Sequence, residues 1–269
     1  MISFTNDSLD LGQIAASGQC FRMSKIGDGR FSIISDDRYI SACQDGNEIF
    51  LDCTSEEFES YWKSYFDLDT DYAGFISSVD ASDVYLIDAA SFGKGIRILR
   101  QDLWEMIVSF LISQQNNITR IRRCINNISE KYGEKKAASD GTAYYAFPKP
   151  EAFAHLEEDA LMECNLGYRS KYVVRTAKMV NSGAFDLDMV RGLDYENARK
   201  KLMELYGVGA KVADCICLFA LHKLEAFPID THIKQVLNTQ YPKGFPFDRY
   251  KGYEGVIQQY IFYYDLRGK

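Results

Sequence analysis

The sequence lacks several features that would mark a special class of protein. Only 5 of the 269 residues are proline, and no internal repeat or low-complexity segment is evident, so collagen-like and disordered chains are excluded. The longest apolar stretch, around 104–112, is too short to span a bilayer and is interrupted by polar residues. The first residues, MISFTNDSLD, are acidic where a signal peptide would be basic and then apolar, so we expect a cytoplasmic protein.

Cysteine occurs without the spacing of a disulfide scaffold. The chain has 7 cysteines, and an odd number in a cytosolic chain of this size indicates free thiols. Apolar residues make up 46% of the sequence, which is enough for a substantial core in one large domain or two smaller ones.

Positive charge is also scarce, but it is unevenly distributed. The net charge of −7, taken alone, argues against a nucleic-acid partner. Residues 1–95 carry 6 Lys and Arg against 17 Asp and Glu, whereas the remainder carries 25 against 21. The acidic average therefore permits a local basic face on the second part of the chain.

Two regions of the chain differ in their hydrophobic period. Up to about residue 95, alternating segments separated by Asp28-Gly29 and Asp45-Gly46 predict mostly β-structure, with a helix near 55–65. Beyond this point a helical period predicts helices at about 104–112, from 118, at 151–163, 170–182 and 195–204, and from 248, with a loop at 133–150. We therefore predict an α+β front part joined to an all-helical back part.

The most informative segment is 202–237. Gly207-Val208-Gly209 between two predicted helices suits a tight turn with its backbone at the surface. The amides at the start of the second helix would then form a site for phosphate that does not read sequence. An ordinary packed corner between two helices is the alternative.

Three polar residues near this turn add chemistry. Lys211 lies in the first helical turn, where the dipole and partial burial would lower the pKa of its amine and make it a nucleophile for a sugar. Asp230 is expected to be an N-cap, held ionised and able to stabilise positive charge on a sugar ring. His232 is either a phosphate contact or an ordinary surface histidine.

The motif GVGAKVADCICL followed by FPIDTH resembles the helix–hairpin–helix DNA glycosylases, and within them most closely the 8-oxoguanine DNA glycosylases. Four further matches occur in the same order along the chain: SGQCFR at 17–22, NNITR at 116–120, LGYR at 166–169 and FYYDLR at 262–267. The resemblance implies an α+β fold, with a TBP-like antiparallel β-sheet domain over 1–95. A helical glycosylase region over 96–269 would follow, with its hairpin motif at about 199–222.

Enzymes of this kind rotate the damaged base out of the duplex into a pocket. The resemblance implies that the Gly18 carbonyl accepts the hydrogen that distinguishes 8-oxoguanine from guanine. It also implies that Cys215 and Phe262 sandwich the base, and that Gln258 bonds its pairing edge. Helical spacing agrees, because Gln258 and Phe262 share one face and Cys215 faces the same way as Lys211. Ordinary core packing of Cys215 and Phe262 is the alternative.

The resemblance further implies a DNA-binding set that comprises Gln115, Asn116, Asn117, Arg120, Tyr168, Arg169, Gly207, Gly209 and His232. In this set Arg120 and Arg169 donate to the orphaned cytosine, while Tyr168 wedges beside the vacated position. Asn116 and Asn117 brace the opened stack. Gln115 departs from the family, which often has asparagine there, and its longer side chain could change the selectivity for the partner base.

No cofactor is expected to be required. Relatives that act on oxidised pyrimidines or mispaired adenine commonly carry an iron–sulfur cluster near the C-terminus, and no cysteine follows Cys217 here, so we expect no cluster. By resemblance, the backbone carbonyls of Met203, Leu205 and Val208 form a candidate site for a monovalent cation that would bridge to phosphate. A water molecule is the alternative occupant.

These features predict a bifunctional DNA glycosylase and apurinic/apyrimidinic lyase, monomeric, acting on duplex DNA with 8-oxoguanine opposite cytosine in base excision repair. Lys211 would attack the anomeric carbon while Asp230 stabilises the oxocarbenium-like charge. One alternative is a helix–hairpin–helix glycosylase for another damaged purine, although alkylation-specific relatives usually lack the lysine. The other is a non-catalytic DNA-binding module, which leaves Lys211 and Asp230 unexplained. In a prokaryote the location would be nucleoid-associated.

Overall fold

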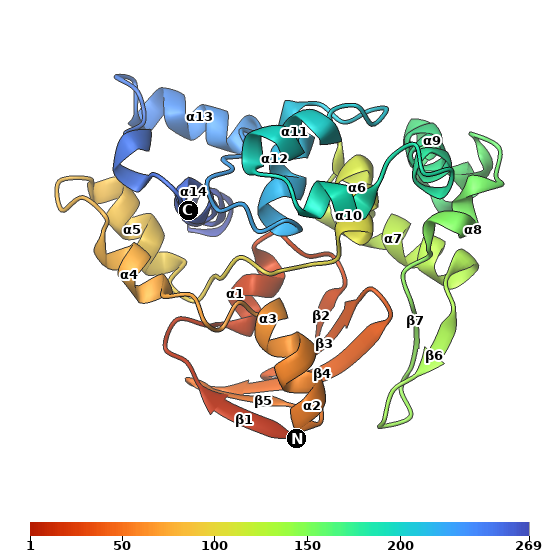
Figure 1. The fold of residues 1–269 in the computed structure, drawn as a ribbon. Helices are drawn as coiled ribbons and strands as arrows, with labels where there is room; N and C mark the ends of the chain where they lie inside the picture. Colours follow the sequence, from red (N-terminus) through yellow and green to blue (C-terminus); the bar gives the residue numbers. More distant parts are fainter. Residues whose placement is uncertain (269) are drawn as a thin grey trace.

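The N-terminal sheet has five antiparallel strands in the order β1-β5-β4-β3-β2, in the lower part of the computed structural model in Figure 1. The structure describes residues 1–268. Strands β2 to β5 form a meander, and β1 pairs with β5 at one edge. The strands are β1 Ile2–Thr5, β2 Met23–Gly27, β3 Arg30–Ser35, β4 Arg38–Asp45 and β5 Glu48–Leu51. The predicted antiparallel N-terminal sheet is confirmed.

One face of this sheet is covered by helical segments. These are α1 Leu11–Ala16 and an unbroken helical stretch made of α2 Ser55–Glu57, the π-turn Phe58–Trp62 and α3 Lys63–Tyr65. Alternate residues of β3, Phe31 and Ile33, are buried and pack in one cluster with Leu11 and Trp62. The strand period of two therefore delivers one apolar face to this core, and the helix predicted at 55–65 is confirmed.

The rest of the first 95 residues is less β-rich than predicted. Residues 72–92 form two helices, α4 Tyr72–Ser77 and α5 Val84–Phe92. Asp71 and Asp83 cap them by accepting from the amides of Gly74 and Leu86. Their buried side chains join the helical core, and α5 packs along the C-terminal helix. The expectation of mostly β-structure overlooked the two aspartate caps, which are start signals for helices.

The helical part contains a further set of elements. They are α6 Leu103–Ser113, α7 Ile118–Tyr132, β6 Lys135–Ala137, β7 Ala143–Tyr145, α8 Pro150–Ala154, 3-10 turns Ala160–Cys164 and Gly167–Arg169, α9 Ser170–Asn181, α10 Leu187–Arg191, α11 Tyr195–Leu202, α12 Ala210–Phe219, α13 Thr231–Gln240, a 3-10 turn Phe247–Tyr250 and α14 Glu254–Arg267. Among residues 1–268, no helix has both the length and the apolar character needed to cross a membrane.

Most of the predicted helices are confirmed here, with three corrections. The predicted loop at 133–150 contains the β6–β7 hairpin, which the Tyr144 hydroxyl joins to the main sheet by donating to the Asp37 carbonyl. The helix predicted at 151–163 is split into α8 and a 3-10 turn. The last helix begins at Glu254, because the segment before it, Phe247–Tyr250, forms a separate 3-10 turn.

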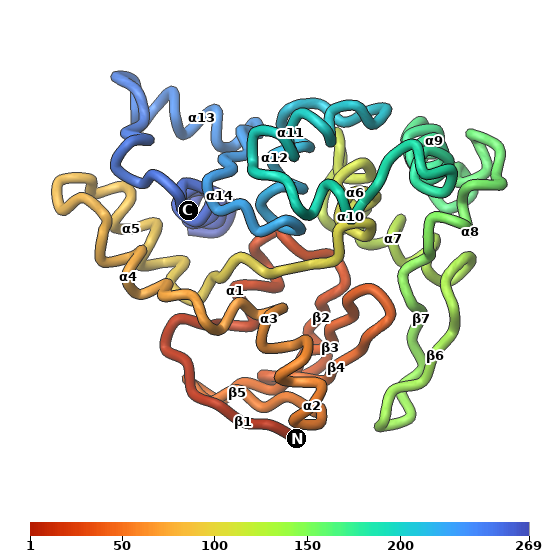
Figure 2. Tube along the Cα trace, in the orientation of Figure 1, coloured from red at the N-terminus to blue at the C-terminus, as the bar shows by residue number. Residues whose placement is uncertain are grey.

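The segment 93–102 runs between the sheet and the helices, as Figure 2 shows. Arg97 is buried there, donates to the Phe66 carbonyl and lies 4.1 Å from the centre of the Tyr72 ring. The Gln19 side chain binds the same segment twice, at the Arg97 carbonyl (2.8 Å) and the Leu99 amide (2.9 Å). Buried and satisfied polar contacts of this kind hold a loop in one position. Through Gln19, they fix the neighbouring Gly18 relative to segment 93–102.

Candidate active site

The turn between α11 and α12 exposes its backbone. Gly207 has φ +90°, and a Cβ built there would lie 2.7 Å from the Tyr172 ring, so the position requires glycine both for its backbone angle and for close packing. Gly209 is the N-cap of α12, with no side-chain cap and no atom within 4 Å of an added Cβ. Gly209 and Ala210, at the start of α12, are exposed, as expected for a turn with its backbone at the surface.

Two hollows meet beside this turn. A small inner pocket of about 50 Å³ is lined by Ser17, Gly18, Phe110, Lys211, Cys215, Phe219, Pro228, Asp230, Gln258, Gln259 and Phe262. An open groove of about 1080 Å³, which we call the lesion groove, runs past it over the first turns of α7, α12 and α13. Five residues line both: Gly18, Phe110, Lys211, Asp230 and Phe262. The predicted catalytic pair thus lies where the pocket opens into the groove.

Lys211 is half-buried, with Nζ 5.8 Å from the centre of the Phe110 ring. Its pKa is raised above the usual value by the Cys215 sulfur and by the Asp230 carboxylate, against burial, which lowers it. The sequence prediction of a lowered pKa is therefore wrong. The interactions with these two neighbours outweigh desolvation, so the resting side chain is an ammonium ion.

Asp230 has the local role that its position in the sequence predicted. Its side chain accepts from the Ile233 amide at 2.8 Å and caps α13. The carboxylate is half-buried and also lines the inner pocket. A capping carboxylate is held in place by the backbone, which leaves its second oxygen available to a group in the pocket.

Cys215 and Gln258 form part of the pocket wall. Cys215 is buried, and burial raises the pKa of its thiol even though Lys211 opposes that shift. The Gln258 amide nitrogen donates to the Pro228 carbonyl at 3.1 Å, while its Oε1 is buried and has no hydrogen-bond partner among residues 1–268. A buried acceptor without a partner is unusual and costly, and this one lines a pocket that a ligand could enter.

Gly18 and Phe262 are close neighbours at the pocket mouth. Gly18 has φ +78°, and a Cβ built on it would lie 3.2 Å from the Phe262 ring. Its chain segment is fixed from α14, because the Gln259 amide donates to the Ser17 carbonyl at 2.7 Å. The four predicted base-binding residues, Gly18, Cys215, Gln258 and Phe262, are thus brought together around one cavity.

The predicted DNA-binding residues divide into two groups. Gln115, Asn116 and Asn117 line the lesion groove at the corner between α6 and α7. Asn117 caps α7 by accepting from the Arg120 amide, and Gln115 has φ +47°. These residues therefore shape the corner as well as line it, and their contacts with DNA remain predictions.

Arg120, Tyr168 and Arg169 lie behind this corner. Arg120 and Tyr168 are exposed, but Arg169 is buried. The Arg169 guanidinium donates to the carbonyls of Gln114 and Gln115 and lies 4.5 Å from the centre of the Tyr168 ring. Its donors thus point at the backbone of the corner in this structure, and a direct contact with an orphaned base is not part of this arrangement.

His232 and the hairpin carbonyls complete the predicted set. His232 is exposed and lines the lesion groove, with Nδ1 3.0 Å from the Asp265 carboxylate. Met203, Leu205 and Val208 lie on one turn, in which the Val208 amide donates to the Leu205 carbonyl. Among residues 1–268, no cluster of three or more His, Cys, Asp or Glu side chains is placed to hold a metal ion.

Phe110 and Gln259 are pocket residues that sequence reasoning missed. Phe110 belongs to the apolar α6, where nothing distinguishes it from core residues. Gln259 carries a signal that was available, because a second glutamine beside Gln258 in an otherwise apolar stretch of helix must find a buried partner.

Comparison with known proteins gives consistent matches. Residues 1–107 match the model described as 8-oxoguanine DNA glycosylase, N-terminal domain, and residues 108–242 match the HhH-GPD superfamily base excision DNA repair protein. An N-glycosylase/DNA lyase of Saccharomyces cerevisiae is 34% identical over 206 residues, which is 71% of this chain and 54% of the relative. The chain thus spans about half the length of that relative.

Two further relatives are covered over a larger share of their own length. N-glycosylase/DNA lyase OGG1 of Arabidopsis thaliana is 29% identical over 245 residues, which is 87% of this chain and 67% of the relative. The Clostridium acetobutylicum 8-oxoguanine glycosylase/lyase, solved with double-stranded DNA containing cytosine opposite 8-oxoG, has a TM-score of 0.92 and 33% identity, covering 100% of this chain and 98% of that one.

Proposed function

Because this chain belongs to the HhH-GPD superfamily of base excision DNA repair proteins and carries the N-terminal domain of 8-oxoguanine DNA glycosylases, we propose that it is a bifunctional 8-oxoguanine DNA glycosylase and lyase. Its substrate is duplex DNA in which the lesion has been rotated out of the stack. The observation that carries the proposal is the position of Lys211 and Asp230, at the point where the small inner pocket opens into the lesion groove.

The inner pocket is the site for the extruded base. At about 50 Å³ it is well below the ~300 Å³ of common ligand sites, so it must enlarge when a base enters. Phe262 is the wall that can move, because its ring is only partly buried and packs against Gly18 across the mouth. The base then lies between the Phe262 ring and Cys215.

Gln258 supplies polar recognition inside the pocket. Its buried Oε1 has no partner among residues 1–268, and an N–H on the pairing edge of a purine would satisfy it. We expect the carbonyl of Gly18, which also lines the pocket, to accept the hydrogen that 8-oxoguanine carries and guanine lacks. A guanine base would leave that acceptor unpaired, which is the basis of discrimination.

The reaction begins with the Lys211 amine. Since its raised pKa keeps it protonated at rest, it must first lose a proton to water in the groove before Nζ can bond to the anomeric carbon of the deoxyribose. As that bond forms, the glycosidic bond breaks and the base leaves with its electron pair. The Asp230 carboxylate, fixed by its capping bond, stabilises the positive charge that develops on the sugar.

The second step follows from the covalent product. The sugar ring then opens: the Nζ lone pair forms a double bond to the anomeric carbon as the C1′–O4′ bond breaks and O4′ takes up a proton. The resulting Schiff base makes the hydrogens on the neighbouring carbon acidic. Loss of one of these protons breaks the C3′–O bond by β-elimination, and water then releases Lys211. The protein therefore nicks the strand at the abasic site that it creates.

The lesion groove binds the two strands around this site. We expect the amides at Gly207 and Gly209 and the side chain of His232 to contact phosphate, because Gly209 and His232 line the groove. We expect Arg120, which is exposed, to donate to the orphaned cytosine, while Arg169 holds the corner that carries Gln115. A monovalent cation at the Met203, Leu205 and Val208 carbonyls would strengthen the phosphate site. No step above depends on it.

The remaining proposals concern the whole molecule. We place it in the cytoplasm, associated with the nucleoid if the cell is a prokaryote, and as a monomer on its DNA.

Base release tests the proposal. The protein is incubated in excess over duplexes containing 8-oxoguanine opposite each of the four bases, and over a duplex containing an alkylated purine. The freed base and nicked strand are quantified. We expect release of 8-oxoguanine, fastest opposite cytosine, and a nick in the same strand. Release of an alkylated purine instead, or binding without release of any base, would establish one of the two competing functions.

A further inference from the structure

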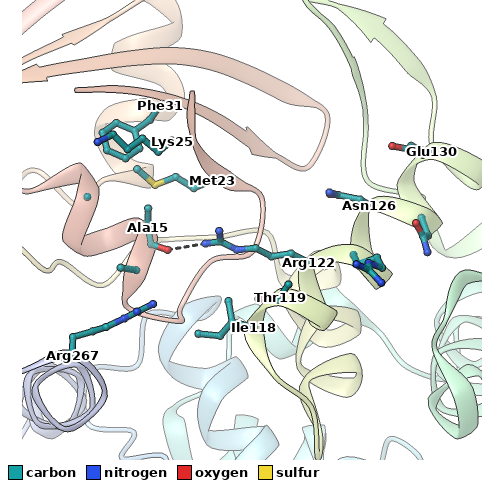
Figure 3. Close-up of a pocket in the computed structure, with 14 residues that line it drawn as sticks. Ala15, Met23, Lys25, Phe31, Ile118, Thr119, Arg122, Asn126, Glu130 and Arg267 are labelled. Atoms are coloured by element: carbon teal, nitrogen blue, oxygen red, sulfur yellow. Dashed lines mark hydrogen bonds between the residues drawn. The ribbon is translucent and has the colours of Figure 1, made fainter. Parts of the chain in front are cut away.

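A second groove lies beside the lesion groove and has no part in the mechanism above. It has a volume of about 730 Å³ and runs between α1, strands β2 and β3, the outer side of α7 and the end of α14. Figure 3 shows Lys25 on the strand side, Arg267 approaching from the last helix, and Arg122 crossing between α7 and α1. We call it the flanking groove.

The flanking groove is basic on an acidic protein. Four cationic side chains line it, Lys25, Arg122, Arg123 and Arg267, against one carboxylate, Glu130, although the whole chain has a net charge of −7. Clustered like charges of this kind repel one another unless an anion lies between them, and they focus a positive potential in the groove.

These cations are largely free to bind something else. Among residues 1–268, Arg123 and Arg267 take part in no ion pair or hydrogen bond. Lys25 has one ion pair, at 3.8 Å to Asp28, and both side chains are well exposed, so that pair is weak. The charges in the flanking groove are therefore not required to hold the fold together.

Arg122 is the one member with a structural contact. Its guanidinium donates to the Ala15 carbonyl at 2.8 Å, which fixes the side chain across the groove. Its buried Nε has no partner in the described chain. A guanidinium held in this way by one contact still has donors to offer to a planar or tetrahedral anion.

The flanking groove adjoins the lesion groove at the start of α7. Ile118 and Thr119, in the first turn of α7, line both. A polyanion lying in the lesion groove would therefore pass directly to the flanking groove along the first two turns of α7.

We propose that the flanking groove binds the phosphate backbone of the duplex beyond the lesion, so that the N-terminal sheet domain takes part in holding DNA. That the ligand is DNA rests on the proposed function. That the site is here rests on the positive charge of the flanking groove and on its position beside the lesion groove. Contacts of this kind carry no sequence information and depend strongly on salt.

The test compares two double variants of the full chain. Lys25→Gln/Arg123→Gln removes two exposed charges from the flanking groove. Lys94→Gln/Lys243→Gln removes two exposed charges that line neither groove and makes the same change in net charge. Binding to an undamaged duplex of about 20 base pairs, two helical turns, is measured by fluorescence anisotropy between about 0.05 and 0.2 M salt. Thermal unfolding confirms that each variant is folded.

We expect the slope of log affinity against log salt to fall in magnitude by about 1.8 for the groove variant, since each phosphate contact contributes about 0.9. The Kd at 0.1 M salt should rise by up to about 60-fold, and the control should keep the wild-type slope. An unaltered slope in the groove variant, or an equal change in the control, would overturn the inference. Failure of the proposed function is seen separately, as absence of base release by the unmodified protein.

Discussion

The inner pocket and the lesion groove share a border but are built by different means. The pocket is made by side chains from distant parts of the chain, Cys215, Gln258 and Phe262 among them, which converge on one small volume. The groove is made mainly by the starts of three helices, where glycine, asparagine and aspartate caps leave the backbone near the surface. This difference indicates a division of labour: changes in the pocket should alter chemistry and lesion choice, and changes in the groove should alter DNA binding.

Lys211→Gln is expected to have the largest effect and to separate the two regions most clearly. Loss of the nucleophile should reduce the single-turnover rate of base release by about 10⁴-fold or more, while binding of lesion-containing duplex persists. Lys243→Gln, an exposed lysine outside both hollows, is the matched control. Release at a near-normal rate by Lys211→Gln would mean that another group attacks the sugar.

The rate of base release, which depends on the pocket, should change with pH. DNA binding, which depends on the groove, should not. Because the pKa of Lys211 is raised above its usual value, the free amine is a minor species that increases tenfold for each pH unit below that pKa. The single-turnover rate should therefore rise about 10³-fold from pH 6 to pH 9. Affinity for undamaged duplex, measured over the same range, should change far less. A flat rate profile would exclude loss of the amine proton as a step before the transition state.

Asp230 lines both the pocket and the groove. Two substitutions can separate its role as a helix cap from its role in stabilising charge on the sugar. Asparagine caps a helix as well as aspartate does, whereas alanine forfeits about 1 kcal/mol. Both Asp230→Asn and Asp230→Ala should slow base release by about 10²–10³-fold, because the charge opposite the sugar is lost. Only the alanine variant should also lower the melting temperature. Equal melting temperatures for the two variants would argue against the capping bond to Ile233.

Gln258 tests recognition inside the pocket. Gln258→Leu should lower the rate of 8-oxoguanine release by about 10-fold to 100-fold, corresponding to ~1.5–3 kcal/mol for lost hydrogen bonds to the base. Gln235→Leu, an exposed glutamine on α13, controls for the change of residue type. If Gln258→Leu released the base as fast as the wild type, the unpartnered Oε1 would not be a contact for the lesion.

Gly207 tests the turn beside the lesion groove. We expect its substitution to have the smallest effect among these variants. Gly207→Ala places a methyl group against the Tyr172 ring at a positive φ and should lower the free energy of unfolding by ~1–3 kcal/mol. Gly183→Ala has a similar φ of +76° but open space around the new methyl group, so the difference between the two variants isolates the ring contact. DNA affinity should fall for Gly207→Ala and remain unchanged for Gly183→Ala.

Local signals in the sequence predicted much of the groove. A glycine turn, an aspartate before a helix and a polar corner are features of neighbouring residues, and the caps at Asp230 and Gly209 follow from them. The pocket was a different case. Its grouping of Gly18, Cys215, Gln258 and Phe262 came from family resemblance, since helical spacing alone relates residues only within one helix.

Tertiary contacts explain two of the differences. The pKa of Lys211 depends on how close Cys215 and Asp230 lie, and the position of Asp230 is a tertiary property. Arg169, predicted to donate to the orphaned cytosine, is buried here against the carbonyls of Gln114 and Gln115, which are distant in sequence. Helices α4 and α5 are a separate case, because the aspartate caps at Asp71 and Asp83 were local signals that the prediction overlooked.

Borohydride reduction during the reaction tests the central claim most directly. A Schiff base between the protein and the abasic sugar would be reduced to a stable amine, and peptide mapping by mass spectrometry would locate it. We predict a single crosslink to duplex containing 8-oxoguanine, on Lys211 Nζ. A crosslink on another residue, or release of the base with no crosslink at all, would contradict the account.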